Sequence, residues 1–125
     1  AAVADFKVGK FNENKIKKKE EIEISLKKNA DILNFVSKHN SLRPKLVIGF
    51  SAETENLEEN SKIKLIEKNC DWIIANDVSD KNIGFNSDFN SVSIFYKNKE
   101  KEIIPKMKKS ILAEEIIKRI SQELN

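Results

Sequence analysis

Two lysines, Lys64 and Lys68, are the residues whose type and spacing could do chemistry in this chain. Side chains four positions apart lie on one face of a helix, so the two ammonium groups would point in the same direction. Paired cations on one face suit a ligand that carries phosphate groups. Lysines on the solvent side of an ordinary helix have the same spacing, and this alternative stays open.

The segment around the two lysines, residues 45–68, predicts a strand, a turn and a helix. Its apolar run 46–48 is short and rich in β-branched residues, which predicts a buried strand, and a turn is expected at 49–52. Asn56, with Glu59 three residues later, resembles a capping box and predicts the helix start. At such a helix start, free N–H groups and the helix dipole favour an anion, as in the ligand crevices of open α/β sheets.

Composition limits the function classes. A chain of 125 residues with 39% apolar and 34% charged residues predicts one soluble domain. Its 23 basic and 20 acidic residues leave a net charge of +3, so we expect no nucleic-acid partner. No apolar run approaches the ~20 residues of a membrane span, so we expect a cytoplasmic protein without a membrane partner. The single cysteine, Cys70, excludes an internal disulfide and predicts a buried thiol in a reducing compartment.

The first third of the chain predicts a strand at 1–6, a lysine-rich loop at 7–21 and a strand at 22–26. The loop is interpreted either as a flap over a ligand or as a solvated basic tract. A helix is expected over about 30–38, capped by Asn29. Because the chain opens inside an apolar strand without a preceding turn, we expect it to be an incomplete domain.

The remainder predicts a strand at 72–75, an antiparallel hairpin at 92–96 and 102–104, and a last helix capped by Ser110. The apolar stripe of that helix is expected at Ala113, Ile116, Ile117, Ile120 and Leu124. Alternating strands and helices followed by a hairpin predict a three-layer, Rossmann-like α/β fold. Its sheet would be mainly parallel, with the antiparallel hairpin at one edge.

Eight motifs occur together in one order. They are AAVADF at 1–6, KIKK at 15–18, NADIL at 29–33, GFSAET at 49–54, the Lys64 and Lys68 pair, ANDVS at 75–79, GFNSDFN at 84–90 and the segment 109–113. With these motifs the chain resembles the carboxyl-terminal half of bacterial phosphopantothenate–cysteine ligase. That ligase is often fused behind a flavin-dependent phosphopantothenoylcysteine decarboxylase, and the resemblance covers essentially the whole chain.

The resemblance implies a two-step reaction in coenzyme A biosynthesis. CTP activates the carboxylate of 4′-phosphopantothenate as an acyl-cytidylate and releases pyrophosphate, and the amine of cysteine then displaces CMP. Mg²⁺ accompanies the nucleotide, whereas FMN belongs to the fused decarboxylase. The GFSAET motif fits the bacterial pattern, which implies CTP rather than ATP. The resemblance also implies a homodimer of the full ligase domain. Because the amino-terminal part of that domain is not in the sequence, we expect the fragment alone to be inactive.

The resemblance also implies the site residues. Lys15 matches the lysine that is associated with formation of the acyl-cytidylate, which makes the basic loop a flap. The implied CTP site comprises Ala1, Asp5, Lys15, Ala30, Asp31, Ile32, Leu33, Phe50, Lys64 and Lys68. Ala30 stands where the family usually has proline, and either residue suits a first helical position. The Mg²⁺ ligands are unassigned, because the triphosphate itself can supply most of them. The alternative function is a non-catalytic nucleotide-binding or scaffolding domain related to the ligase.

Overall fold

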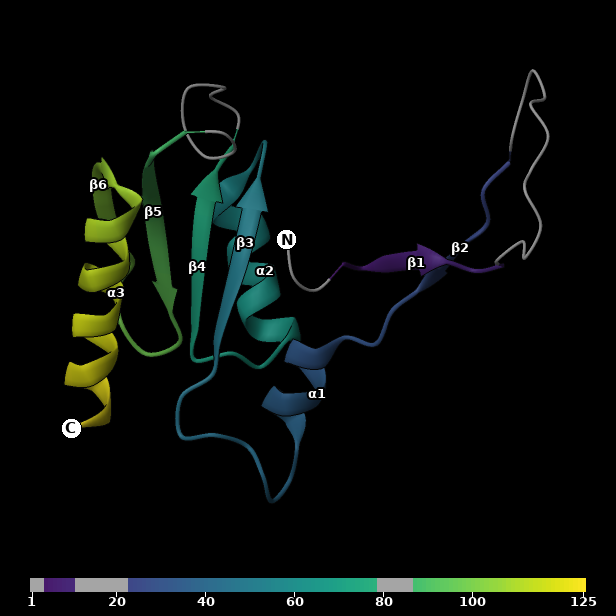
Figure 1. The fold of residues 1–125 in the computed structure, drawn as a ribbon. Coiled ribbons are helices and arrows are strands. Elements are labelled where there is room, and N and C mark those ends of the chain that lie inside the picture. Colours follow the sequence, from purple (N-terminus) through teal and green to yellow (C-terminus); the bar gives the residue numbers. More distant parts are fainter. Residues whose placement is uncertain (1–3, 11–22, 79–86) are drawn as a thin grey trace. The chain divides into compact units, whose positions relative to one another are not determined.

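The computed structural model describes residues 4–10, 23–78 and 87–125 (Figure 1). The chain divides into two compact units, Ala1–Ile32 and Leu33–Asn125. No helix in the described ranges is long and apolar enough to cross a lipid bilayer.

The first unit contains one small antiparallel sheet, formed by β1 (Phe6–Val8) and β2 (Leu26–Lys28). The predicted strands at 1–6 and 22–26 are therefore misplaced: among the described residues, pairing starts at Phe6 and at Leu26. Both strands are exposed along their whole length. A strand without a buried face has nothing to select its register, so the apolar pattern did not locate it.

The second unit is built on a four-stranded sheet in the order β3-β4-β5-β6. Its strands are β3 (Ile48–Glu53), β4 (Trp72–Asp77), β5 (Phe89–Tyr96) and β6 (Glu102–Lys108). β3 and β4 are parallel, whereas β4–β5 and β5–β6 are antiparallel. The α/β class and the antiparallel edge hairpin are confirmed. The parallel part is smaller than predicted, because only β3 and β4 pair in parallel and β4 already pairs antiparallel with β5.

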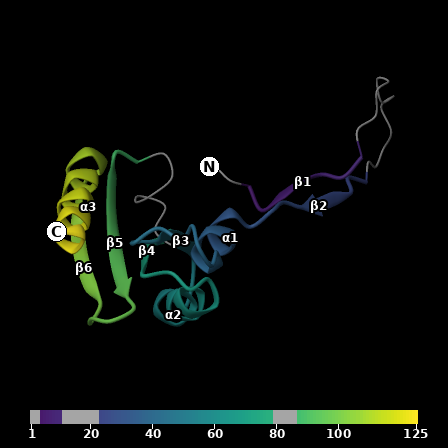
Figure 2. The ribbon, with the colours of Figure 1, turned by 90° about the horizontal axis from the view of Figure 1, so that it is seen from below.

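Helices cover both faces of this sheet, which confirms the three layers. The helices are α1 (Ile32–Lys38), α2 (Leu57–Glu67) and α3 (Lys109–Leu124). α2 and α3 lie on opposite sides of the sheet (Figure 2). The core cluster on the α2 side contains Val47, Leu65, Cys70, Ile73, Ala75 and Phe95. The cluster on the α3 side contains Trp72, Ile74, Val92, Ile94, Ile104 and Leu112. Cys70 is fully buried, as predicted.

Residues 49–52, which the sequence predicted as a turn, belong to β3. A Cβ atom added at Gly49 would lie 2.7 Å from Cδ1 of Ile73 and 2.8 Å from Cδ2 of Leu33. A side chain at position 49 would therefore have to displace two terminal methyl groups, one from β4 and one from α1. The absence of a side chain, rather than backbone freedom, explains why glycine occupies this position.

The helix starts agree only in part with the predicted caps. Asn56 precedes α2 but has a left-handed backbone, with φ 49°, and its side chain makes no capping hydrogen bond. α3 starts at Lys109 after Lys108, so Ser110 lies inside the helix. The side chain of Asn29 donates to the carbonyl of Ala4 at 2.6 Å. The predicted start of α2 at Asn56 is therefore confirmed, although the side chain makes no capping hydrogen bond, whereas α1 and α3 begin at other positions than Asn29 and Ser110 predicted.

The buried stripe of α3 also differs in part from the prediction. Ile116 and Ile120 pack against the α3-side cluster together with the buried Leu112. Ala113, Ile117 and Leu124 are exposed in the second unit. The buried stripe is therefore Leu112, Ile116 and Ile120, which recur every four residues on the side of α3 that lies over β5 and β6.

Candidate functional site

The site starts from three polar side chains at the carboxyl end of β3 and on α2. Nζ of Lys64 lies 2.5 Å from Oε1 of Glu53 and 3.0 Å from Oγ of Ser51. The Ser51 hydroxyl also hydrogen-bonds to Oε1 of Glu53. Asn60, one turn earlier on α2, donates to Oε2 of Glu53 at 3.3 Å. Alternation along β3 turns Ser51 and Glu53 toward α2, which brings these groups together.

The carboxyl group of Glu53 is buried and charged. Burial raises its pKa, but hydrogen bonds from Lys64 and Ser51 and the charge of Lys64 lower it more, so the net pKa lies below its ordinary value. Glu53 therefore neutralises much of the charge of Lys64. An anionic ligand that binds Lys64 would have to share or displace this carboxylate.

The start of α2 does not suit phosphate, contrary to the prediction. Glu58 and Glu59 occupy its first turn. Two carboxylates there stabilise the helix dipole themselves and repel an anion. The cations lie further along the helix: Lys64 is in its last turn, and Lys68 follows as the C-cap. The carbonyl of Lys68 accepts a hydrogen bond from the hydroxyl of Ser37 in α1.

Phe50 lies on the opposite face of β3 from the Lys64 cluster. Its neighbour Ile48, two residues earlier on the same face, packs against the α3-side core, whereas Ser51 and Glu53 face α2. The side chain of Phe50 is 70% exposed. β3 is an edge strand of the described sheet. A ligand that contacts both Phe50 and Lys64 must therefore pass around the end or the edge of β3.

The other predicted residues are divided between the two units. Within the first unit, the backbone N–H of Asn29 donates to the carbonyl of Asp5 at 2.8 Å, which places Asp5 beside the start of segment 30–32. In the second unit, Leu33 packs against the α2-side core near Gly49. Ala1 and Lys15 lie outside the described residues.

Two asparagines at the carboxyl end of β4 were missed as site candidates. Nδ2 of Asn90, on β5, donates to Oδ1 of Asn76, on β4, at 3.2 Å. Both residues belong to motifs of the family resemblance, ANDVS and GFNSDFN. The position of Asn76 at the end of a buried strand was the available signal, since ligands of open α/β sheets bind at such ends.

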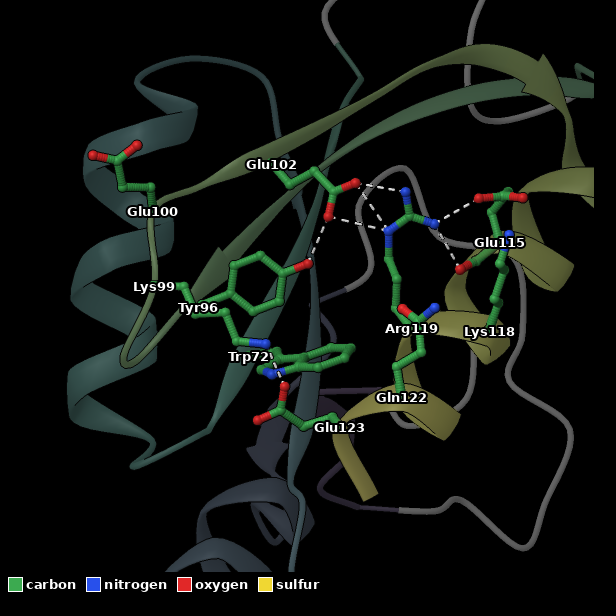
Figure 3. Close-up of a pocket in the computed structure, with 10 residues that line it drawn as sticks. All are labelled: Trp72, Tyr96, Lys99, Glu100, Glu102, Glu115, Lys118, Arg119, Gln122 and Glu123. Carbon is green, nitrogen blue, oxygen red and sulfur yellow. Dashed lines mark hydrogen bonds and ion pairs between the residues drawn. The ribbon is translucent and has the colours of Figure 1, made fainter. Parts of the chain in front are cut away.

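A cavity of about 470 Å³ lies at the other end of the sheet, between the β5–β6 hairpin and α3 (Figure 3). Trp72 and Tyr96 form an edge-to-face pair there, with ring centroids 5.0 Å apart. Nζ of Lys99 lies 5.1 Å from the centre of the Tyr96 ring and is paired with Glu123. The cavity is thus remote from Asn76, which lies at the opposite end of β4 from Trp72.

Arg119 of α3 crosses this cavity and binds the hairpin. Its Nη2 lies 2.5 Å from Oε1 of Glu102, and its Nη1 lies 2.7 Å from Oε2 of Glu115. The hydroxyl of Tyr96 donates to Oε2 of Glu102 at 2.8 Å. Burial and the hydrogen bond to Glu102 raise the pKa of Tyr96 to about 12. Because these charges neutralise one another, we attribute to this network the anchoring of α3 and place the candidate site at the carboxyl end of β3 and β4.

The comparison with protein families decides the family. The model of the DNA/pantothenate metabolism flavoprotein C-terminal domain matches residues 1–124. The chain belongs to this family. The family resemblance that the eight motifs predicted is thereby confirmed.

Two curated relatives and one solved structure indicate the extent of the likeness. The chain is 44% identical over 128 residues to the coenzyme A biosynthesis bifunctional protein CoaBC of Haemophilus influenzae, covering 99% of this chain and 32% of that protein. It is 40% identical over 124 residues to CoaBC of Escherichia coli K12, covering 96% and 30%. A crystal structure of the C-terminal domain of CoaBC superposes with a TM-score of 0.69 at 33% identity, covering 99% of this chain and 52% of that one. The chain thus spans about a third of the length of the curated relatives.

The ligase resemblance implies a nucleotide with Mg²⁺, which raises the question of a metal site among the described residues. They contain no group of three or more His, Cys, Asp or Glu side chains that could hold a metal ion. Glu53, the buried carboxylate of the site, is already bound by Lys64, Ser51 and Asn60. The described residues therefore do not form a metal site.

Proposed function

We propose that this chain supplies the CTP site of a phosphopantothenate–cysteine ligase domain of coenzyme A biosynthesis. The observation that carries the proposal is the family match over residues 1–124. The names of the relatives support a role in coenzyme A biosynthesis. The complete domain would join 4′-phosphopantothenate to cysteine through an acyl-cytidylate.

The proposed roles follow from the chemistry of the side chains. The ammonium groups of Lys64 and Lys68 would bind the triphosphate, and the exposed ring of Phe50 would pack against the nucleotide. Since Lys64 is engaged by Glu53, the triphosphate would take over part of that ion pair. Asp5 and the segment 30–33 would complete the nucleotide site together with Ala1. Lys15 would neutralise the charge that develops when the acyl-cytidylate forms.

Several features of the whole protein belong to the same proposal. Mg²⁺ would bind with the triphosphate and supply charge neutralisation there. The complete ligase domain would act as a homodimer in the cytoplasm. An FMN-dependent phosphopantothenoylcysteine decarboxylase fused to the same polypeptide would consume the ligase product; the relatives are themselves named as bifunctional proteins.

The test uses the intact polypeptide that contains residues 1–125. It is incubated with phosphopantothenate, cysteine, Mg²⁺ and either CTP or ATP, and pyrophosphate release is followed. We expect release that requires CTP and phosphopantothenate, with ATP a poor substitute. Binding of CTP without pyrophosphate release would contradict the ligase and favour the alternative, a non-catalytic nucleotide-binding or scaffolding domain.

A matched pair of variants tests the flap assignment. Lys15→Ala should abolish formation of the acyl-cytidylate while the fold persists, and Lys19→Ala in the same basic loop should retain activity. Near-normal activity of Lys15→Ala would refute the role of this lysine.

A further inference from the structure

The side-chain amides of Asn76 and Asn90 lie on the same face of the sheet as Phe50. Asn76 pairs in register with Ala52 of β3 and with Val92 of β5, and paired residues point to the same face. Phe50 lies two residues before Ala52, and Asn90 lies two residues before Val92, so all five side chains share that face. The amide pair therefore stands at the carboxyl end of β4, on the face where Phe50 is exposed.

The hydrogen bonds of Asn90 fix which way its amide points. The backbone N–H of Ser91 donates to Oδ1 of Asn90 at 3.0 Å. A backbone N–H can only donate, so the atom that it contacts must be the amide oxygen. The amide nitrogen of Asn90 is consequently the atom directed at Asn76. With Asn90 only 8% exposed, this orientation is held inside the protein.

The orientation of Asn90 then determines that of Asn76. The amide nitrogen of Asn90 has only hydrogens to offer, so Asn76 must present its oxygen, as the 3.2 Å contact with Oδ1 shows. In a planar amide the NH₂ group lies on the other side of the carbon from the oxygen. The NH₂ group of Asn76 therefore points away from Asn90, and Asn76 is only half-buried.

We propose that Asn90 is a positioning residue that holds Asn76 with its N–H donors toward the bound nucleotide. The group of the ligand that meets Asn76 is then a hydrogen-bond acceptor, such as the O2 or N3 atom of a cytosine base packed beside Phe50. This inference rests on the proposed nucleotide site and adds to it a requirement on the polarity of the ligand.

Asn90→Asp tests directly whether Asn76 presents its donor group to the ligand, because the substitution keeps the shape of the side chain at position 90. One carboxylate oxygen still accepts the N–H of Ser91, and the other faces Asn76, whose amide must then turn its NH₂ group toward Asp and its oxygen toward the ligand. The oxygen of Asn76 would then face the acceptor group of the ligand, and no hydrogen bond could form between them. We expect this loss to lower CTP affinity about tenfold or more. Asn98→Asp, an exposed substitution in the β5–β6 turn, is the charge-matched control.

The experiment measures equilibrium binding of CTP by the intact polypeptide, together with KM and kcat for CTP and thermal melting. A positioning role predicts a raised KM with kcat largely retained, and no further effect of Asn90→Asp once Asn76 is replaced by alanine. Asn76→Asp, which leaves the contact with Asn90 intact, should weaken CTP binding similarly and serves if Asn90→Asp does not fold.

The outcomes distinguish failure of the positioning role of Asn90 from failure of the proposed function. If wild-type protein binds CTP and both aspartate variants bind it equally well, the positioning role is overturned and the proposed function stands. If the wild-type protein neither binds nor uses CTP, the proposed function fails and the inference fails with it. Additive losses in the double variant would also overturn the inference, because Asn90 would then not act through Asn76.

Discussion

Nζ of Lys64 lies 2.5 Å from Oε1 of Glu53, on the face of β3 opposite to the exposed ring of Phe50. β3 thus has the ion pair between its own Glu53 and Lys64 of α2 on one side, and the exposed ring of Phe50 on the other. A nucleotide that uses both would place its base on one face and its phosphates toward the other, with the end of β3 between them.

Replacing Lys64 by methionine should weaken CTP binding by about tenfold or more, since charge-assisted hydrogen bonds contribute about 1.5–3 kcal/mol each. Lys62→Met on the same helix is the matched control, because Lys62 pairs with the exposed Glu58 instead. Calorimetric titration of the intact protein with CTP measures both. Equal affinities for the two variants would exclude Lys64 from the nucleotide site.

The free energy of unfolding should decrease at acid pH because of Glu53. Its pKa is lowered in the folded state from an ordinary value of 4.5, so its contribution to the free energy of unfolding is fully present above pH 4.5. That contribution is lost as the pH falls from 4.5 through the lower folded pKa. Urea unfolding between pH 3 and pH 7 measures it, and Glu53→Gln should show a smaller loss over this acid range. An unchanged pH profile would contradict the ion pair.

Tyr96 should make the free energy of unfolding decrease at alkaline pH. Its folded pKa is raised to about 12 from 10.0, so its stabilising effect is complete below pH 10 and is lost as the pH rises toward 12. Tyr96→Phe removes the hydrogen bond to Glu102 and should lower the free energy of unfolding at pH 7 by about 1 kcal/mol. It should also flatten the alkaline decline, which thermal melts at pH 8 to pH 11 would record. If Tyr96→Phe lost stability at alkaline pH as steeply as the wild type, Tyr96 would not be the cause of that loss.

Most elements of the second unit followed directly from sequence patterns. β4, the β5–β6 hairpin and the buried Cys70 were predicted because continuous apolar runs and clean alternation mark strands with a fixed buried face. Asn56 marks the start of α2 as predicted, although without a capping hydrogen bond, whereas Ser110 lies inside α3, because a side chain of the right type does not by itself determine where a helix begins. Gly49 was misread as a turn residue, since its need for space comes from Ile73 and Leu33, which are distant in sequence.

The sequence predicted the site residues only in part. The family motifs selected Phe50 and Lys64, and their spacing is visible in the sequence. Burial of Glu53 beside Lys64 and the contact between Asn76 and Asn90 depend on strand alignment, which one-dimensional patterns do not contain. The role of Lys15 and Ala1 stays a prediction, as both lie outside the described residues.

Gly49→Ala should destabilise the second unit by about 1–3 kcal/mol, the usual cost of inserting a methyl group into a packed core. The added Cβ would lie within 3 Å of Ile73 and Leu33, as the 2.7 Å and 2.8 Å distances require. Ala52→Ser, at an exposed position of the same strand, should change stability by less than about 0.5 kcal/mol. Urea unfolding of both variants provides the comparison, and equal stabilities would show that the sheet has room at position 49.

The central claim, activation of a carboxylate by CTP, is tested most directly by trapping the intermediate. The intact polypeptide is mixed with CTP, Mg²⁺ and phosphopantothenate without cysteine, quenched, and analysed by mass spectrometry. We expect a phosphopantothenoyl-cytidylate that accumulates and is converted to product and CMP when cysteine is added. If no cytidylate forms, or if only ATP yields an adduct, the assignment of a CTP-dependent ligase is contradicted.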